Sequence, residues 1–137
     1  MAGSATNYTE NNLIDHLFRT NSFSKPSALY VALYTTTPSD SGGGTEVSMT
    51  GYARVQRNPS DSNWAATSGT DGTTKNSAVL DFGTWTAGGP VTVTGFAILD
   101  ASSSGNMIVW GDLTASKTIQ NGDAMQIPAN NLTVSID

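Results

Sequence analysis

The chain has one histidine, His16, and no cysteine, so few side chains are available for covalent chemistry. A catalytic histidine needs a nucleophile or a base partner, and nothing near His16 in the sequence resembles a nucleophile motif. Without cysteine there is no disulfide, no thiolate nucleophile and no cysteine-based zinc site, and one histidine excludes a His-rich metal site. These residue types predict a protein that is not an enzyme and has no cofactor.

Carboxylates are the other group that could act in catalysis or bind a cation. Nine Asp and two Glu could in principle supply the acid and base of a glycosidase, or ligands for calcium. Oxygen-rich segments such as Asp71-Gly72 do not follow the twelve-residue calcium loop with its closing glutamate. An aspartate near Gly or Ser has a simpler role, because its side chain bonds the backbone of a turn. We therefore interpret most of them as turn residues, namely Asp40, Asp61, Asp71, Asp100 and Asp123.

Aromatic side chains are stronger candidates for a function, because Trp and Tyr anchor protein interfaces. A sugar-binding groove would use the same residue types, with Trp64 and Trp85 as candidates. For any single aromatic, packing in the core is the alternative role. The predicted contact residues are Tyr8, Tyr30, Tyr34, Tyr52, Arg54, Trp64 and Trp85.

Composition narrows the class of partner. Charged residues are 12% of the chain and the formal net charge is −5, which disfavours nucleic acid and anionic membranes, since both attract clustered Lys and Arg. No apolar run approaches the roughly 18 residues of a membrane helix, and the polar first residues do not resemble a secretory signal. Ser, Thr, Asn and Gly make up 60 of the 137 residues, which is typical of a loop-rich β-domain with an uncharged polar surface.

One helix is predicted near the start of the chain. Residues 1–8 are small and polar and predict a flexible arm. Thr9 is a plausible N-cap for a helix over residues 9–19, with Glu10 in the first turn where the helix dipole favours a carboxylate. The helix has one apolar stripe, formed by Leu13, Ile14, Leu17 and Phe18, which must pack on another surface. The simplest surface is the β-structure of the same domain, and the alternative is a neighbouring protein.

Short strands are predicted over the rest of the chain. Alternating apolar residues and turn signals place them at 29–34, 52–57, 77–82, 91–99, 107–110, 117–119, 124–127 and 132–136, with a shorter one near Trp64. Asn121-Gly122 predicts a hairpin between two of them, since both residues accept the positive φ of a type I′ turn. The predicted fold is all-β, an antiparallel jelly roll or β-sandwich of about eight strands with one N-terminal helix, in a single domain over 9–137.

Eight short segments form an ordered set that runs along nearly the whole chain, at residues 11–19, 29–35, 37–40, 42–47, 51–54, 95–100, 110–113 and 132–134. No single segment is specific, but the ordered set is distinctive. Together these segments resemble a family of small tailed-bacteriophage virion proteins.

This resemblance implies a structural role in the virion. Family members are often labelled tail-fibre proteins, and the size and helix-then-β layout are also similar to jelly-roll cement proteins that decorate phage heads. We therefore expect a capsid cement protein that binds the major capsid protein on the outside of the head as a dimer or trimer. The alternative is a tail fibre or baseplate component, such as a receptor- or carbohydrate-binding module. Neither nucleic acid nor membrane is an expected partner.

Overall fold

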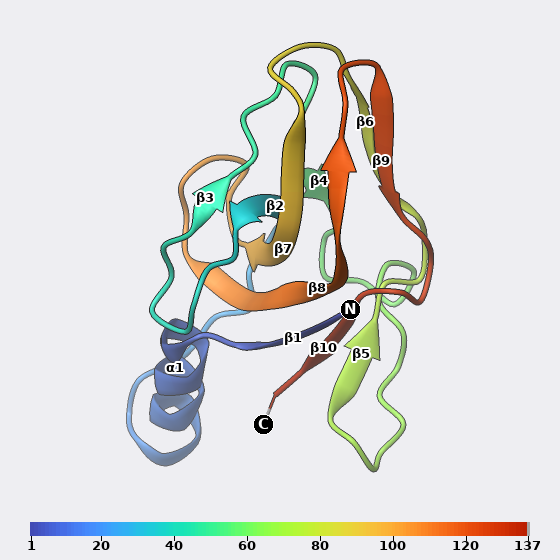
Figure 1. Ribbon diagram of the computed structural model, residues 1–137. Helices are drawn as coiled ribbons and strands as arrows, with labels where there is room; N and C mark the ends of the chain where they lie inside the picture. Colours follow the sequence, from blue (N-terminus) through green and yellow to red (C-terminus); the bar gives the residue numbers. More distant parts are fainter. Residues whose placement is uncertain (137) are drawn as a thin grey trace.

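A computed structural model describes residues 1–136, and its architecture confirms the predicted all-β fold with one N-terminal helix (Figure 1). Residue 137, the last residue of the predicted domain, lies outside the described residues. The helix is α1 (Asn7–Phe18). The strands are β1 (Ala2–Ala5), β2 (Tyr30–Thr36), β3 (Thr45–Glu46), β4 (Val55–Gln56), β5 (Thr73–Lys75), β6 (Leu80–Trp85), β7 (Val91–Leu99), β8 (Met107–Ile119), β9 (Asp123–Ile127) and β10 (Thr133–Ser135).

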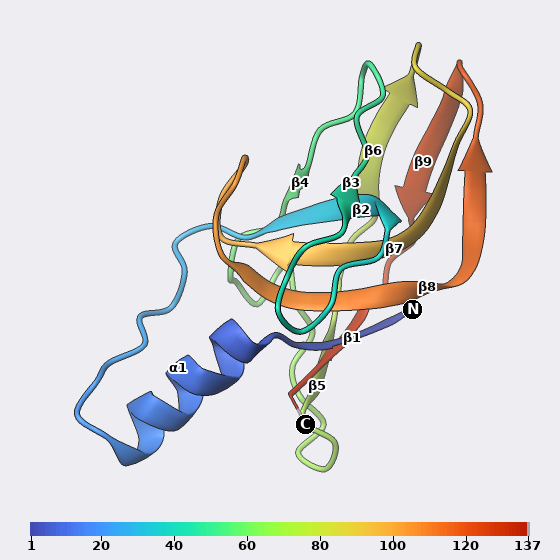
Figure 2. The ribbon, with the colours of Figure 1, turned by 60° about the vertical axis from the view of Figure 1, so that its left-hand side comes forward.

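The strands form a sandwich-like arrangement of one large and one small sheet. The large sheet has the order β3-β2-β7-β8-β1-β10-β5, with β4 also pairing with β2, and the small sheet consists of β6 and β9. The long β7–β8 hairpin is paired from Val91 and Ile119 to Leu99 and Met107, with a register shift beside Gly95. Figure 2 shows this hairpin curving upward toward β6 and β9, so that it closes one side of the core.

The core lies on both faces of β2, as the alternation of its residues predicts. Val31 and Leu33 are fully buried in the main core between the sheets. Ala32 and Tyr34 point to the other face and form a second, smaller cluster with Ala97 and other residues of β7. β2 also lies in the interior of the large sheet, because it pairs with β7 on one side and with β3 and β4 on the other.

Asn76 is the buried polar residue that connects the ends of several strands. Its side-chain amide donates to the carbonyl oxygens of Ala78 and Pro128 at 2.8 and 2.9 Å. Its side-chain oxygen accepts from the N–H of Leu132 at 2.9 Å. The side chain has no exposed surface, so these bonds replace the water that it loses on folding.

The predicted flexible arm at residues 1–8 is instead ordered. Residues 2–5 form β1, which runs antiparallel to β8 and parallel to β10, in the interior of the large sheet. Gly3 and Ala5 are buried because their small size allows close approach to the core, where a Cβ on Gly3 would lie 2.7 Å from Val109 Cγ1. The pair β1–β10 is also an exception to the expected antiparallel pairing.

The helix begins two residues earlier than predicted, because Thr6 rather than Thr9 is its N-cap. The Thr6 hydroxyl accepts a hydrogen bond from the Thr9 N–H at 3.4 Å. Both threonines fit the cap by type, and the choice depends on Thr6 lying against β8. The helix ends at Phe18. Within residues 1–136, no helix is long and apolar enough to span a bilayer.

The Asn121-Gly122 turn forms, but it does not make a hairpin. The turn is closed by hydrogen bonds between Gln120 and Asp123, and Gly122 has a φ of 89°. The strands that it joins, β8 and β9, belong to different sheets, because β9 pairs with β6. Asn121-Gly122 therefore lies at the turn where the chain passes from the large sheet to the small sheet.

Candidate functional site: the Glu46 network and the apolar face of α1

Two of the seven predicted contact residues are core residues instead. Trp85 has no exposed surface, and its indole N–H donates to the carbonyl oxygen of Phe82 at 3.0 Å. Its ring meets Tyr52 edge-on, with the ring centres 5.5 Å apart. Tyr34 is 4% exposed. Side chains enclosed in this way have no surface to offer a partner, so packing explains both.

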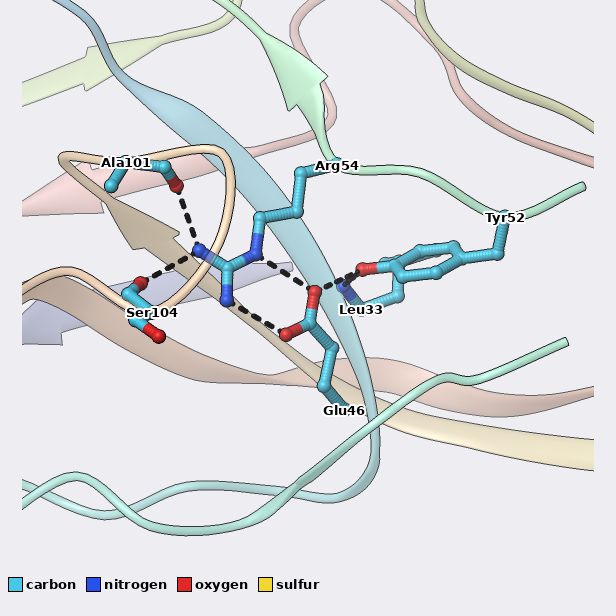
Figure 3. A network of polar contacts seen from close by, with 6 residues as sticks. All are labelled: Leu33, Glu46, Tyr52, Arg54, Ala101 and Ser104. Carbon is cyan, nitrogen blue, oxygen red and sulfur yellow. Dashed lines mark hydrogen bonds and ion pairs between the residues drawn. The ribbon is translucent and has the colours of Figure 1, made fainter.

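Two more predicted contact residues, Tyr52 and Arg54, meet at one acidic side chain (Figure 3). Arg54 Nε and Nη2 donate to the two carboxylate oxygens of Glu46 at 2.9 and 2.8 Å. The Tyr52 hydroxyl donates to Glu46 Oε1 at 2.8 Å and accepts from the Leu33 N–H at 3.0 Å. We call Glu46, Tyr52 and Arg54 the Glu46 network.

The Glu46 network also binds the loop between β7 and β8, which is distant in the sequence. Arg54 Nη1 donates to the carbonyl oxygens of Ala101 and Ser104, at 2.7 and 2.9 Å. These residues lie in the loop between β7 and β8, so one guanidinium joins that loop to β3. A planar guanidinium suits this task because its N–H groups form a fixed fork that a carboxylate accepts in pairs.

The charges of the network stabilise one another. Partial burial favours the protonated form of Glu46, but the hydrogen bonds from Arg54 and Tyr52 and the charge of Arg54 lower its pKa overall. The hydrogen bond to Glu46 raises the pKa of Arg54, and burial raises the pKa of Tyr52. At neutral pH the network is thus an ionised pair with a neutral tyrosine. Both carboxylate oxygens of Glu46 and all three guanidinium nitrogens of Arg54 already have hydrogen-bond partners. The Glu46 network therefore has a structural role.

Replacing Glu46 with Gln is expected to lower the free energy of unfolding at pH 7 by about 1.5–3 kcal/mol, the range for hydrogen bonds to charged groups. Because the pKa of Glu46 is lowered on folding, its carboxylate stabilises the fold above its unfolded pKa, which is about 4.3. That contribution is lost as the pH falls through the folded pKa. Urea unfolding at pH 7 and near pH 2 should therefore show a difference between Glu46→Gln and wild type that shrinks in acid.

The matched control for this substitution is Asp15→Asn, which breaks the exposed Asp15–Arg19 ion pair on α1. Exposed pairs contribute about 0–1 kcal/mol, so this variant should unfold close to wild type at both pH values. An equal loss for Glu46→Gln at both pH values would contradict the role of its charge.

The remaining predicted contact residues are dispersed. Tyr30 and Trp64 are half-buried, and the indole N–H of Trp64 donates to the carbonyl oxygen of Arg57 at 3.2 Å. Tyr8 lies on α1, is 37% exposed, and meets the ring of Phe23 edge-on at 6.0 Å. The seven residues therefore do not form one contact patch.

Within residues 1–136, the hydrogen bonds that join α1 to the sheet and to the loop at Asp40 lie at the start of the helix. The Thr6 N–H and the Thr9 hydroxyl both donate to the carbonyl oxygen of Ile108 in β8, at 3.1 and 2.8 Å. The Asn7 N–H donates to the carbonyl oxygen of Asp40 at 3.0 Å. Beyond these bonds the helix projects away from the strands, as Figure 2 shows. Thr9 is the one buried residue of α1.

The apolar stripe of α1 faces solvent rather than the β-structure, which corrects the expectation that it packs on the sheet. Ile14 is 54% exposed, Leu17 is 62% exposed and Phe18 is 78% exposed. These positions follow the i, i+3, i+4 spacing of one helix face, and half-buried Leu13 adjoins them. We call Leu13, Ile14, Leu17 and Phe18 the α1 stripe.

Burial of the α1 stripe against a partner would be favourable. Burying one large apolar side chain contributes about 1.5–3 kcal/mol, so burying Ile14, Leu17 and Phe18 together would contribute several kcal/mol. A helix of 12 residues is also marginally stable by itself, because most helical stability comes from packing. Clustered exposed apolar groups on a projecting helix mark a site of protein interaction.

Among residues 1–136, no three His, Asp or Glu side chains form a group that could hold a metal ion. His16 Nδ1 accepts a hydrogen bond from the Phe23 N–H at 3.1 Å, so this ring supports the turn after the helix.

Comparison with known proteins gives the family. A family model described as Gp80, podophage GP4 fiber I protein gp80, matches residues 4–135. The chain belongs to the Gp80 family. It is therefore a protein of the bacteriophage virion, as the resemblance implies. A comparison with curated proteins found no match.

The Gp80 match takes in α1 and strands β2 to β10, so both the α1 stripe and the Glu46 network lie within the part that defines the family. Sequence reasoning found the α1 stripe as a pattern but missed its exposure. The pattern is the same for a helix that packs on its own sheet and for one that awaits a partner.

Proposed function

We propose that this member of the Gp80 family is a non-enzymatic component of a phage fibre, attached to a neighbouring virion protein through the α1 stripe. The observation that carries this proposal is the α1 stripe itself, since three large apolar side chains on one projecting helix face are exposed. The description of the family as a fibre protein supports a tail location.

A rigid β-domain with one exposed apolar contact surface, the α1 stripe, suits a fibre component. The Glu46 network and the two-sided core of β2 hold the body in one shape, and α1 presents the contact. The Thr6 cap and the bond from Thr9 to Ile108 order the first turn of α1, which reduces the conformational entropy that attachment costs.

A capsid cement role would use the same kind of surface, with the major capsid protein as partner. The family description favours a fibre over cement, so we place cement second. A carbohydrate-binding role has weaker support. Trp85, one of the two candidates for a sugar platform, is buried, and Trp64 is half-buried with its N–H already bonded.

Replacing both Leu17 and Phe18 with Glu is expected to reduce incorporation of the protein into virions at least tenfold, because two charges on the α1 stripe cannot be buried without partners. The measurement is the copy number per particle after infection of cells that supply only the variant. Val79→Glu is the matched control, because Val79 is an exposed apolar residue outside α1, at 43% exposure. Normal incorporation of the double variant would refute attachment through α1.

Antibody labelling of wild-type virions separates the two locations. A fibre component should label the tail, at six to a few dozen copies on symmetry grounds. Label over the head, with hundreds of copies, would contradict the fibre proposal and favour cement.

A further inference from the structure

Strand β1 and helix α1 together form an arm, residues 1–18, that is bound to the rest of the chain along β1 and at the first turn of α1. β1 lies between β8 and β10. The Thr133 N–H donates to the carbonyl oxygen of Met1 at 3.0 Å, and the Ser135 hydroxyl donates to that of Gly3 at 3.4 Å. We call the space between β8 and β10 that holds β1 the β1 slot, and the strands from β2 onward the body.

The β1 slot is shaped for a strand of very small residues. Gly3 lies beside Gly111 of β8, and a Cβ on Gly111 would lie 2.9 Å from Gly3 Cα and would clash with the carbonyl oxygen of Ala2. A Cβ on Gly3 would in turn lie 2.7 Å from Val109 Cγ1. Glycine at both positions permits this close approach of the two backbones. The slot therefore specifies β1 as its occupant, and every copy of the chain carries this strand.

The arm is joined to the body by a linker, residues 19–28, that can act as a hinge. The linker bonds to α1, as in the hydrogen bond from the Phe23 N–H to His16 Nδ1 at 3.1 Å. Among the described residues, no hydrogen bond joins the linker to the strands. Figure 2 shows the linker returning past α1 to reach β2. Fully extended, it spans about 35 Å, so the arm can reach a second body that lies beside the first.

Exchange of the arm between copies preserves every contact in the β1 slot. The bonds to β8 and β10 are the same whether the slot belongs to the arm's own chain or to another, so the linker decides between the two arrangements. A short flexible linker holds the arm near its own slot at an effective concentration on the order of millimolar. Dilute copies therefore keep their own arms, and exchange is favoured where copies are crowded together in an assembled particle.

We propose that, in the assembled virion, the arm of one copy fills the β1 slot of a neighbouring copy. Each chain has one arm and one slot, so repeated exchange links copies into a ring or a continuous chain. The linker ties the donor's body to the far end of α1, beside Leu17 and Phe18, which are 62% and 78% exposed. The α1 stripe then lies between two bodies. This inference rests on the proposed attachment through α1 and names its partner as a second copy.

Shortening the linker tests whether the arm can be exchanged. Deleting residues 21–26 leaves four linker residues, which span at most about 14 Å, whereas the 12 residues of α1 extend about 18 Å. The arm should then no longer reach its own slot. In sedimentation velocity the shortened chain should form dimers or larger assemblies at a concentration at which wild type is monomeric.

The matched control replaces the same six residues with Gly and Ser, which removes the same side chains but keeps the length. This control should remain monomeric. The shortened assembly should unfold at the same urea concentration as the control, because its slots are filled. A shortened chain that stays monomeric, whether it is folded or not, would contradict exchange of the arm.

A disulfide shows which copy fills each slot in the virion itself. The sequence has no cysteine, and Ala2 of β1 lies opposite Thr133 of β10. Neighbouring strands are about 4.8 Å apart, which is within the range of about 4.4–6.8 Å between the Cα atoms of a disulfide. Virions assembled with the Ala2→Cys/Thr133→Cys variant and then oxidised should give bands of two or more linked copies on a non-reducing gel. Single chains alone would show that each arm fills its own slot and would overturn the inference.

The matched control for the disulfide is Lys75→Cys/Thr133→Cys. Lys75 of β5 lies opposite Thr133 on the other side of β10, and both residues belong to the body. Oxidation should therefore link them within one chain, and the control should give single chains. Linked copies of the Ala2→Cys/Thr133→Cys variant must exceed those of the control.

The two readouts distinguish failure of this inference from failure of the proposed function. Single chains on the gel, together with lost incorporation of the Leu17→Glu/Phe18→Glu variant, would overturn exchange and leave attachment through α1 to a different virion protein. Normal incorporation of that double variant would instead count against the attachment itself.

Discussion

Deleting residues 1–5 is expected to remove on the order of half of the 5–15 kcal/mol that stabilises a typical domain. These residues form β1, which joins β8 to β10 in the interior of the large sheet. Without β1, both neighbours lose their ladder partner and the buried surface around Ala5 is opened to water. The measurement is urea unfolding, with hydrogen exchange of β10 as a local readout.

Gly3→Val tests the same strand without shortening the chain. A Cβ on Gly3 would lie 2.7 Å from Val109 Cγ1 and 2.8 Å from Phe96 Cζ, so a larger side chain should displace β1. Overpacking of this kind costs about 1–3 kcal/mol. Ser4→Val is the matched control, because Ser4 is exposed and a β-branched residue suits a strand. If the truncated chain unfolded at the wild-type urea concentration, residues 1–5 would be the flexible arm that their composition predicts.

Replacing Trp85 with Ala is expected to destabilise the fold by about 3–5 kcal/mol, the usual cost of emptying an aromatic site in a core. Trp85 is fully buried and packs edge-on against Tyr52, whose ring is stacked on Phe82 with centres 6.3 Å apart. Loss of the indole also leaves the Phe82 carbonyl without its donor. Urea unfolding followed by far-UV circular dichroism measures the change.

Trp64→Ala is the comparison for this variant. Trp64 is half-buried, so its loss should cost less than that of Trp85. A Trp85→Ala protein with wild-type stability and a specific loss of virion attachment would return Trp85 to the set of contact residues.

The local sequence pattern was sufficient to predict the strands whose pairing partners are near in the sequence. The predicted strand at 91–99 coincides with β7, and the predicted strand at 107–110 is part of β8, which pairs with β7 in a hairpin. In both cases the apolar alternation and an adjacent polar loop determine the outcome.

Elements that depend on distant partners could not be predicted in this way. β1 consists of Ala, Gly and Ser and has no apolar alternation, because close approach to Val109 and Phe96 requires small residues there. Asn121-Gly122 predicts its own turn correctly, but the pairing of β9 with β6 is decided across the molecule. Helix periodicity likewise identifies the α1 stripe without showing that nothing in the same chain covers it.

The position of β1 also affects how fast the protein can fold. β1 pairs with β10, so that Ala2 lies opposite Thr133 although the two residues are far apart in the sequence. The large sheet therefore cannot be completed until these two distant segments meet. Contacts that join distant parts of a sequence form slowly, so this protein should fold on the slower time scale of β-proteins. Until β1 pairs, the edge of β8 that it covers is exposed, which makes this interval the most vulnerable to aggregation.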